Sequence, residues 1–160
     1  MLNFSIKTYF QIIFFISLIS ILSALFIEYV LGHQPCNLCL MQRIPYGLSI
    51  ILIFLNYFLK KDQKFVVMLL VLIFSFSFVI SFYHFGIEQG FFEESAFCGL
   101  KNTTNITSKE ELLKQLQEKN ISCKDVTFKI MGLSLTSYNI IVSLMITISS
   151  VRIYLNYDKN

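Results

Sequence analysis

Four long apolar runs constrain the fold of this 160-residue chain more than any other feature. They extend from Tyr9 to Leu31, from about Cys39 to Leu59, from Phe65 to Phe85 and from about Leu135 to Tyr154. Each run approaches the ~20 residues that an α-helix needs to cross a ~30 Å hydrocarbon core. Because such continuous runs are too long for barrel strands, we predict one all-α membrane domain over residues 1–160, a bundle of four transmembrane helices.

The composition agrees with a bilayer environment. Hydrophobic residues make up 55% of the chain and charged residues 14%, too few charges to cover a surface in water. The net charge is +3, and no basic tract is dense enough to indicate nucleic-acid binding. The first run exceeds the 7–15-residue core of a signal peptide and lacks a small-x-small cleavage site, so we expect it to remain as an anchor.

Charges near the helix ends predict the orientation. Lys60–Lys64 carries three lysines between the second and third runs, Lys7 precedes the first run, and Arg152 and Lys159 close the fourth. The positive-inside rule assigns this face to the cytoplasm. We therefore expect both termini inside and two outer loops, a short turn after the first run and a long loop over residues 86–134.

The long outer loop contains one predicted helix. Ser108 and Glu111 have the spacing of a capping box. They open the segment "KEELLKQLQEK", in which Leu112, Leu113 and Leu116 lie on one side. This pattern predicts a short amphipathic helix.

All four cysteines would lie on or near the outer face, which in a bacterium is the periplasm, where disulfides persist. Cys36 and Cys39 form a C-x-x-C pair in the first outer turn, and Cys98 and Cys123 belong to the long loop. The C-x-x-C spacing lets two sulfurs meet in a disulfide or on a metal. At the positive end of a helix dipole such thiols have a lowered pKa and favour the reactive thiolate.

Arg43 follows Cys39 by four residues, so a helix would place both on one face, about one turn apart. Its guanidinium would stabilise a thiolate at Cys39 and could hold a polar oxygen of a bound ligand. The alternative is an interfacial arginine that extends to lipid headgroups. The C-x-x-C pair above it favours the redox interpretation.

The loop cysteines Cys98 and Cys123 have no C-x-x-C neighbour, and a structural disulfide is their simplest interpretation. A zinc site of all four cysteines is disfavoured, because thiolate zinc sites combine a C-x-x-C with another close pair; we expect no metal. Two cysteine pairs on one side of a membrane suit an electron relay by thiol–disulfide exchange. The final acceptor would then lie in the membrane beside Cys39.

The chain resembles the disulfide bond formation protein B (DsbB) family, the quinone-linked thiol oxidases of the bacterial inner membrane. The resemblance covers nearly the whole chain. It rests on "PCNLCLMQRIPY" after the first run, "YHFGIEQGFF" leaving the third, the two loop cysteines, and "FKIMGLSLTSYN" entering the fourth. Helix number, cysteine order and the spacing from Cys39 to Arg43 agree together.

The resemblance implies a role for each cysteine. Cys98 would form a mixed disulfide with a reduced DsbA-like thioredoxin-fold protein of the periplasm. The released Cys123 would attack Cys36 of the C-x-x-C disulfide. Cys39 would remain as a thiolate that passes electrons to ubiquinone or menaquinone.

Two further residues would contact the quinone. The resemblance implies that Arg43 steadies the thiolate and a quinone oxygen, and that His84 is the family histidine near the quinone. Family members often carry an acid beside the arginine, where this chain has Gln42. Glu28, within the first run, is an intramembrane acid and hence a candidate functional residue, although a snorkelling or hydrogen-bonded glutamate is favoured near the headgroups.

The alternative interpretations are three other kinds of protein: a different enzyme family, a specialised paralogue and a non-enzymatic subunit. A vitamin K epoxide reductase-like enzyme would have its loop cysteines before the C-x-x-C pair, the reverse of the order seen here. A specialised DsbB paralogue for one dedicated partner remains open. So does a non-enzymatic membrane subunit with two structural disulfides. Four cysteines allow three pairings, and the sequence does not choose among them.

Overall fold

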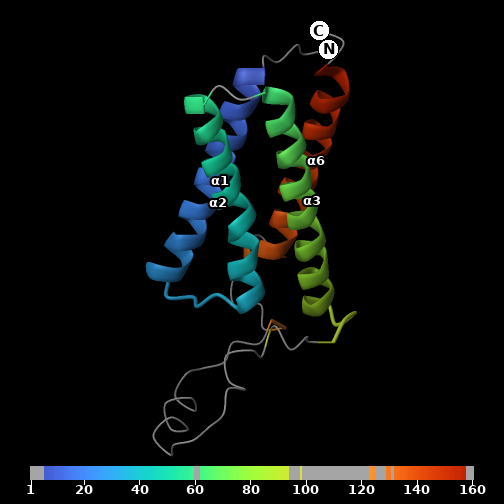
Figure 1. The fold of residues 1–160 in the computed structure, drawn as a ribbon. Coiled ribbons are helices and arrows are strands. Elements are labelled where there is room, and N and C mark those ends of the chain that lie inside the picture. The colour runs from blue at the N-terminus through green and yellow to red at the C-terminus, as the bar shows by residue number, and fades with distance from the viewer. Residues whose placement is uncertain are drawn as a thin grey trace, which may run out of the picture.

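A computed structural model describes residues 6–59, 62–93, 98, 123–124, 129–130 and 132–157. Within these ranges four long helices run alternately up and down, with both ends of the chain at the same end of the bundle (Figure 1). They are α1 (Ile6–Tyr29), α2 (Asn37–Leu59), α3 (Gln63–Glu88) and α6 (Leu135–Asn156). Each is long and apolar enough to cross a membrane. The predicted all-α, four-helix fold is confirmed.

The ends of two helices differ from the ends of the apolar runs that predicted them. α3 extends to Glu88, three residues beyond its predicted end at Phe85, because apolar runs mark the lipid-embedded part while backbone hydrogen bonding continues outside it. α1 ends earlier than predicted, at Tyr29, before Gly32 with its positive φ of 72°. The helix predicted from Ser108 lies outside the described residues.

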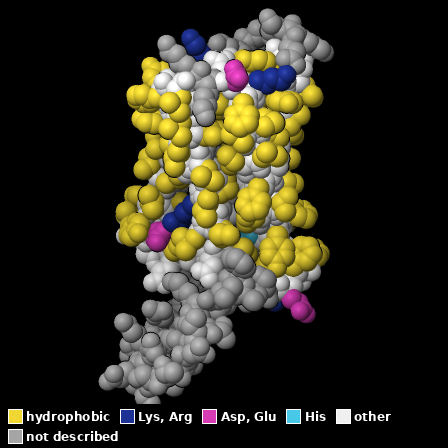
Figure 2. Space-filling model, in the orientation of Figure 1, with side chains coloured by type: hydrophobic (Ala, Val, Ile, Leu, Met, Phe, Trp, Pro, Cys, Tyr) yellow, Lys and Arg dark blue, Asp and Glu magenta, His cyan; other side chains and the backbone are white. Residues whose placement is uncertain are grey.

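The helix interfaces combine a cluster of buried apolar side chains with small polar side chains. α3 packs along α6 and α2, and α2 along α1. Ser77 and Ser143 hydrogen-bond between α3 and α6 at 3.0 Å, and Ser17 and Ser49 between α1 and α2 at 2.8 Å. In lipid, apolar side chains gain little by leaving the hydrocarbon, so close packing of small residues and interhelical hydrogen bonds hold a bundle together. On the face shown in Figure 2, apolar side chains cover most of the length of the bundle, and the charged side chains lie near its two ends.

We call the end of the bundle opposite the two termini the cysteine end. It contains the start of α2, the end of α3 and a two-stranded antiparallel pair, β1 (Lys129–Ile130) and β2 (Leu133–Ser134), in which Lys129 faces Ser134. β2 leads directly into α6, whose first turn is capped by the Ser134 side chain accepting from the Ser137 N–H.

The chain that leaves α3 folds back onto it. The N–H groups of Phe91 and Phe92 donate to the Gly86 carbonyl at 2.8 and 3.2 Å, and the Phe92 ring stacks on Tyr83. A Cβ at Gly86 would lie 2.1 Å from the Phe92 ring, so only glycine admits this contact. This fold-back fixes the position of Phe92, from which the chain continues to Cys98.

Candidate functional site

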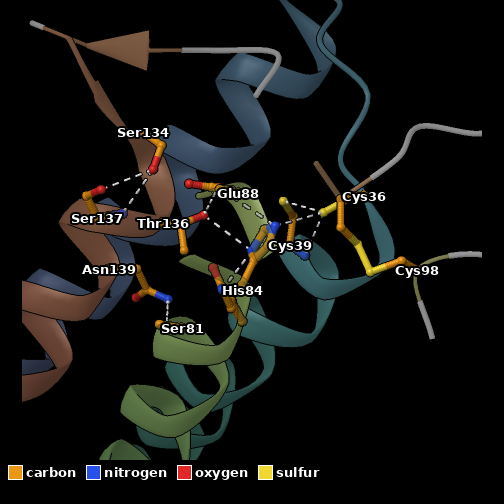
Figure 3. Close-up of polar contacts among 12 residues, drawn as sticks. Cys36, Cys39, Ser81, His84, Glu88, Cys98, Ser134, Thr136, Ser137 and Asn139 are labelled. Atoms are coloured by element: carbon orange, nitrogen blue, oxygen red, sulfur yellow. Dashed lines mark hydrogen bonds and ion pairs between the residues drawn. A yellow bond between two sulfur atoms is a disulfide. The ribbon is translucent and has the colours of Figure 1, made fainter. Parts of the chain in front are cut away.

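Cys36 and Cys39 lie at the start of α2, at the cysteine end (Figure 3). Both are free thiols, and their Sγ atoms are 2.8 Å apart. The Cys39 backbone N–H also donates to the Cys36 Sγ at 3.3 Å, because the first turn of a helix leaves its N–H groups unpaired. Cys36 is buried and Cys39 half-buried. The pair is thus close enough to form a disulfide with little movement.

His84 of α3 joins the C-x-x-C pair to the other helices (Figure 3). Its Nε2 lies 3.6 Å from the Cys36 Sγ. Its Nδ1 lies 3.0 Å from the Gln42 Nε2 and 3.2 Å from the Thr136 Oγ1. The side chain is 2% exposed. The family resemblance implied a contact between His84 and a quinone, which stays a prediction. The structure places His84 against Cys36.

Glu88 is a site residue that the sequence analysis missed. Its Oε1 accepts from the Thr136 hydroxyl at 2.6 Å and lies 3.8 Å from the His84 Nε2. The side chain is 5% exposed, and within the described part of the chain its Oε2 has no hydrogen-bond partner. Glu88 follows His84 by one helical turn, a spacing that would have pointed to it had the predicted helix been extended.

The contacts around Cys36 favour its thiolate. Its pKa is lowered from 9.0 to about 4, chiefly by the hydrogen bond from Cys39; burial opposes the shift, and His84 adds to it. The C-x-x-C motif at a helix start predicted activated thiols, and the spacing of Arg43 predicted that its guanidinium supports Cys39. In the structure the stabilising donors instead converge on Cys36.

Arg43 has a different partner from the one its spacing suggested. Its guanidinium forms an ion pair with the Glu28 carboxylate, which joins α2 to α1. The two side chains are 22% and 21% exposed, so the pair lies at the surface of the bundle. This confirms the hydrogen-bonded interpretation of Glu28. A role of Arg43 toward Cys39 or a quinone stays a prediction.

Cys98 and Cys123 form a disulfide with their Cα atoms 5.7 Å apart. Both are buried, and they belong to the same packed cluster as Cys36, together with Leu38 and Ile87. Figure 3 shows this disulfide beside the start of α2. Of the three possible pairings, the structure therefore has the loop pair bonded and the C-x-x-C pair reduced. All four cysteines lie together.

Comparison with known proteins decides the family. The sequence profile of the family described as "Disulfide bond formation protein DsbB" matches residues 6–153. The chain belongs to the DsbB family. It is also 36% identical over 84 residues to "SPbeta prophage-derived disulfide bond formation protein B" of Bacillus subtilis (strain 168), a match that covers 52% of this chain and 55% of that protein. A second relative, "Uncharacterized protein RP370" of Rickettsia prowazekii (strain Madrid E), is 27% identical over 135 residues, 83% of this chain and 78% of that protein.

Membership in the DsbB family indicates which chemistry the clustered cysteines perform. Proteins of this family are membrane disulfide bond formation proteins, which implies disulfide oxidoreductase activity. Thiol–disulfide exchange needs a thiolate that can reach a disulfide and a thiol that leaves easily. The described residues of this DsbB-family chain provide both, in the packed cysteine cluster and in the lowered pKa of Cys36.

Proposed function

We propose that this DsbB-family protein reoxidises a DsbA-like thioredoxin-fold protein and passes the electrons through Cys98/Cys123 and Cys36/Cys39 to a membrane quinone. One observation carries the proposal: the Cys98–Cys123 disulfide packs in a single buried cluster with Cys36, whose own partner sulfur is 2.8 Å away. Two cysteine pairs in contact, one bonded and one reduced, are what a relay by exchange requires.

The first half of the relay transfers the partner's electrons inward. A partner thiolate attacks the Cys98 Sγ, the Cys98–Cys123 bond breaks, and Cys123 leaves as a thiolate. Cys123 then attacks Cys36 of a Cys36–Cys39 disulfide, and Cys39 leaves as a thiolate. Two bonds have broken and two have formed, so no electrons are lost.

The second half restores the loop disulfide. The partner's second thiolate attacks its own mixed disulfide and departs oxidised, leaving Cys98 as a thiolate. Cys98 attacks Cys123 and releases Cys36. A thiol of lower pKa leaves faster, so the lowered pKa of Cys36 favours this step. The end state has Cys98 bonded to Cys123 and the C-x-x-C pair reduced by two electrons, the arrangement that the structure describes.

The surroundings of Cys39 fit a quinone, a flat apolar ring with two polar oxygens. Cys39 is half-buried. In the same helix, Leu40 follows it directly and Ile44 lies one turn beyond Leu40, and these two apolar side chains are 41% and 51% exposed. Arg43, one turn on, offers N–H donors at the bundle surface. Ubiquinone or menaquinone, when bound, would take up two electrons and two protons. Arg43 would hold one quinone oxygen, and His84 would contact the ring from the side of Cys36.

The proposed location is the bacterial inner membrane with both termini in the cytoplasm. Both ends of the chain lie at the end opposite the cysteines (Figure 1), which supports a single-sided arrangement of the thiols. The end of α2 at Leu59 and the start of α3 at Gln63, which flank the lysine-rich sequence, lie at the end that carries the termini. The cysteine end would then face the oxidising periplasm, where the partner is found.

The decisive experiment couples the two half-reactions. The full-length protein, purified in detergent, is mixed with a reduced DsbA-like protein and a water-soluble quinone analogue. Quinone absorbance and partner thiols are followed together. We expect one quinone reduced for every two partner thiols oxidised, and no quinone reduction without the partner.

A variant carrying both Cys98→Ala and Cys123→Ala is the matched control, because it keeps the C-x-x-C pair and lacks the loop pair. It should not oxidise the partner. Partner oxidation at the unaltered rate in this variant, or partner oxidation without quinone reduction, would contradict the relay.

A further inference from the structure

Three soft ligand atoms converge at the cysteine end. The Sγ atoms of Cys36 and Cys39 and a ring nitrogen of His84 all lie within 4.8 Å of one another. Thiolate sulfur and imidazole nitrogen are the ligands that zinc and other thiophilic cations prefer. The sequence disfavoured a zinc site of four cysteines, and the Cys98–Cys123 disulfide excludes that set here. The structure supplies His84 in its place.

The distances are close to those of a tetrahedral centre. With metal–sulfur bonds of about 2.3 Å and metal–nitrogen bonds of about 2.0 Å, sulfur and nitrogen ligands lie about 3.5 Å apart. The Cys36 Sγ and His84 Nε2 are 3.6 Å apart. The two sulfurs, now at 2.8 Å, would separate by about 1 Å, which a rotation of the half-buried Cys39 side chain provides.

The outer contacts of the three ligands also suit a metal. The Cys39 N–H already donates to the Cys36 Sγ and stabilises sulfur charge. The His84 Nδ1 is held by Thr136 and Gln42, so that Nε2 points to the sulfurs. In a metal-bound form Nδ1–H donates to the Thr136 oxygen, whose own proton goes to Glu88; such outer contacts fix the ring of a ligating histidine. The Gln42 amide can flip to present its oxygen.

An independent feature of the same site favours a cation. Glu88 is 95% buried, since only 5% of its side chain is exposed, and its Oε2 lacks a hydrogen-bond partner in the described part of the protein. Its Oε1 lies 3.8 Å from the His84 Nε2. A buried carboxylate oxygen without a donor is costly. A divalent cation on Nε2 would provide the compensating charge and leave Glu88 or a water as the fourth ligand.

We propose that the reduced Cys36–Cys39 pair and His84 bind one thiophilic divalent cation, Zn²⁺ or Cd²⁺. Binding forms two metal–sulfur bonds and one metal–nitrogen bond and releases any remaining thiol protons, with no transfer of electrons. The pair cannot close its disulfide until the metal leaves. The cation is therefore an inhibitor of the reduced state, a consequence that rests on the proposed function, whereas binding itself does not.

The test uses the full-length chain with Cys98→Ser and Cys123→Ser, so that only the C-x-x-C thiols remain. The purified protein is reduced, freed of metal with a chelator, and titrated with Zn²⁺ against a coloured competitor. We expect one equivalent of Zn²⁺ per chain. Oxidation of the pair to its disulfide should weaken binding by at least about 100-fold, because metal ligation requires the thiolates. Equal binding in both redox states would overturn the proposal.

The histidine ligand is tested by a matched pair of variants. His84→Ala should weaken Zn²⁺ binding by about 10-fold or more. His33→Ala changes the other histidine of the chain, outside the cluster, and should leave the affinity unaltered. Since His84→Ala removes a buried side chain, X-ray absorption of the Zn²⁺ form of the His84 protein provides a second measurement. A Zn²⁺ coordination shell that lacks two sulfur atoms and at least one nitrogen atom would contradict the assigned ligands.

Inhibition is measured separately in the coupled assay with partner and quinone analogue. Sub-stoichiometric Zn²⁺ should lower the rate in proportion to the metal bound, and a chelator should restore it. Full activity with the site occupied would overturn the inhibitory role. If the protein shows no coupled activity at all, the proposed function fails while the titration still decides whether the metal site exists.

Discussion

The two cysteine pairs of this protein are close in space but held in different ways. Cys98 and Cys123 are 25 residues apart in sequence, and their disulfide is surrounded by apolar side chains. Cys36 and Cys39 are three residues apart on a helix start, with polar groups of α2, α3 and α6 around them. Among the described residues, packing positions the loop pair, whereas both packing and hydrogen bonds position the helix pair.

The difference shows how two similar chemical groups acquire different reactivity. Apolar packing does not distinguish one sulfur of a disulfide from the other. Directed donors do: the Cys39 N–H, the second thiol and His84 all favour charge on Cys36. The helix pair should therefore be chemically asymmetric. The loop pair should acquire asymmetry only from its partner protein. Four predictions test this contrast.

The largest effect is expected from Cys39→Ser. Serine leaves Cys36 without its disulfide partner, so the helix pair can no longer store two electrons. Quinone reduction in the coupled assay should fall by at least ~10³-fold, as for other covalent sulfur nucleophiles. Partner docking at Cys98 should persist, visible as a mixed disulfide on a non-reducing gel. Full quinone reduction by the Cys39→Ser protein would contradict the proposed role of Cys39 in electron transfer to the quinone.

Next in size is Cys98→Ala, the corresponding change in the loop pair. Alanine removes the sulfur that the partner is proposed to attack, so the covalent partner complex should disappear from the gel. Reduction of the helix pair by a small thiol such as dithiothreitol should continue. A complex of undiminished yield would move the docking role to another cysteine.

The pH dependence of alkylation measures the asymmetry directly. The pKa of Cys36 is about 4 instead of 9.0, so its thiolate fraction is nearly constant from pH 8 to pH 6 and declines only near pH 4. An unperturbed thiol would lose about 100-fold in rate between pH 8 and pH 6. We expect a flat iodoacetamide profile at Cys36 in the reduced, metal-free protein, followed by mass spectrometry.

The loop pair supplies the control for that profile. In a protein with Cys36→Ser and Cys39→Ser, the reduced loop thiols have lost the helix pair and its donors. Their alkylation should fall steeply as the pH is lowered. Parallel profiles for the two pairs would show that the hydrogen bonds around Cys36 do not distinguish them.

The smallest effect is expected from Arg43→Ala. Arg43 is 22% exposed and paired with Glu28. Its replacement should remove the proposed charge-assisted hydrogen bond to a quinone oxygen, worth about 1.5–3 kcal/mol, and so raise the KM for quinone by about 10- to 100-fold. The KM for the partner should be unaltered. Glu28→Gln is the matched control, because it breaks the ion pair and keeps the guanidinium. A change in partner KM alone would contradict the assignment.

The fold was predictable from sequence because lipid imposes length and apolarity on every span. Four runs of about 20 apolar residues leave little choice of architecture. The place of Cys36 and Cys39 at a helix start was equally predictable, since the C-x-x-C pair directly precedes the second run. Such features depend only on neighbours along the chain.

The surroundings of the site depend on how helices are rotated against each other, and the sequence does not specify this. Spacing correctly put Arg43 one turn from Cys39, but the packing of α1 gave it Glu28 as partner. Thr136 meets His84 and Glu88 only because α6 and α3 pack together. Likewise, four cysteines allow three pairings, and the observed one depends on the folded loop.

The fold-back of Phe92 onto Gly86 sets the point from which the chain leads to Cys98. Cys98 follows Phe92 by six residues, and Cys123 precedes Lys129 of β1 by six. A fully extended segment of six residues spans at most about 20 Å. Two short tethers of equal length therefore hold the loop disulfide, and any protein that exchanges with it must bring its thiol within that radius of the bundle. Under the proposed function, the length of these tethers, in addition to sulfur chemistry, would limit which thiols this protein can oxidise.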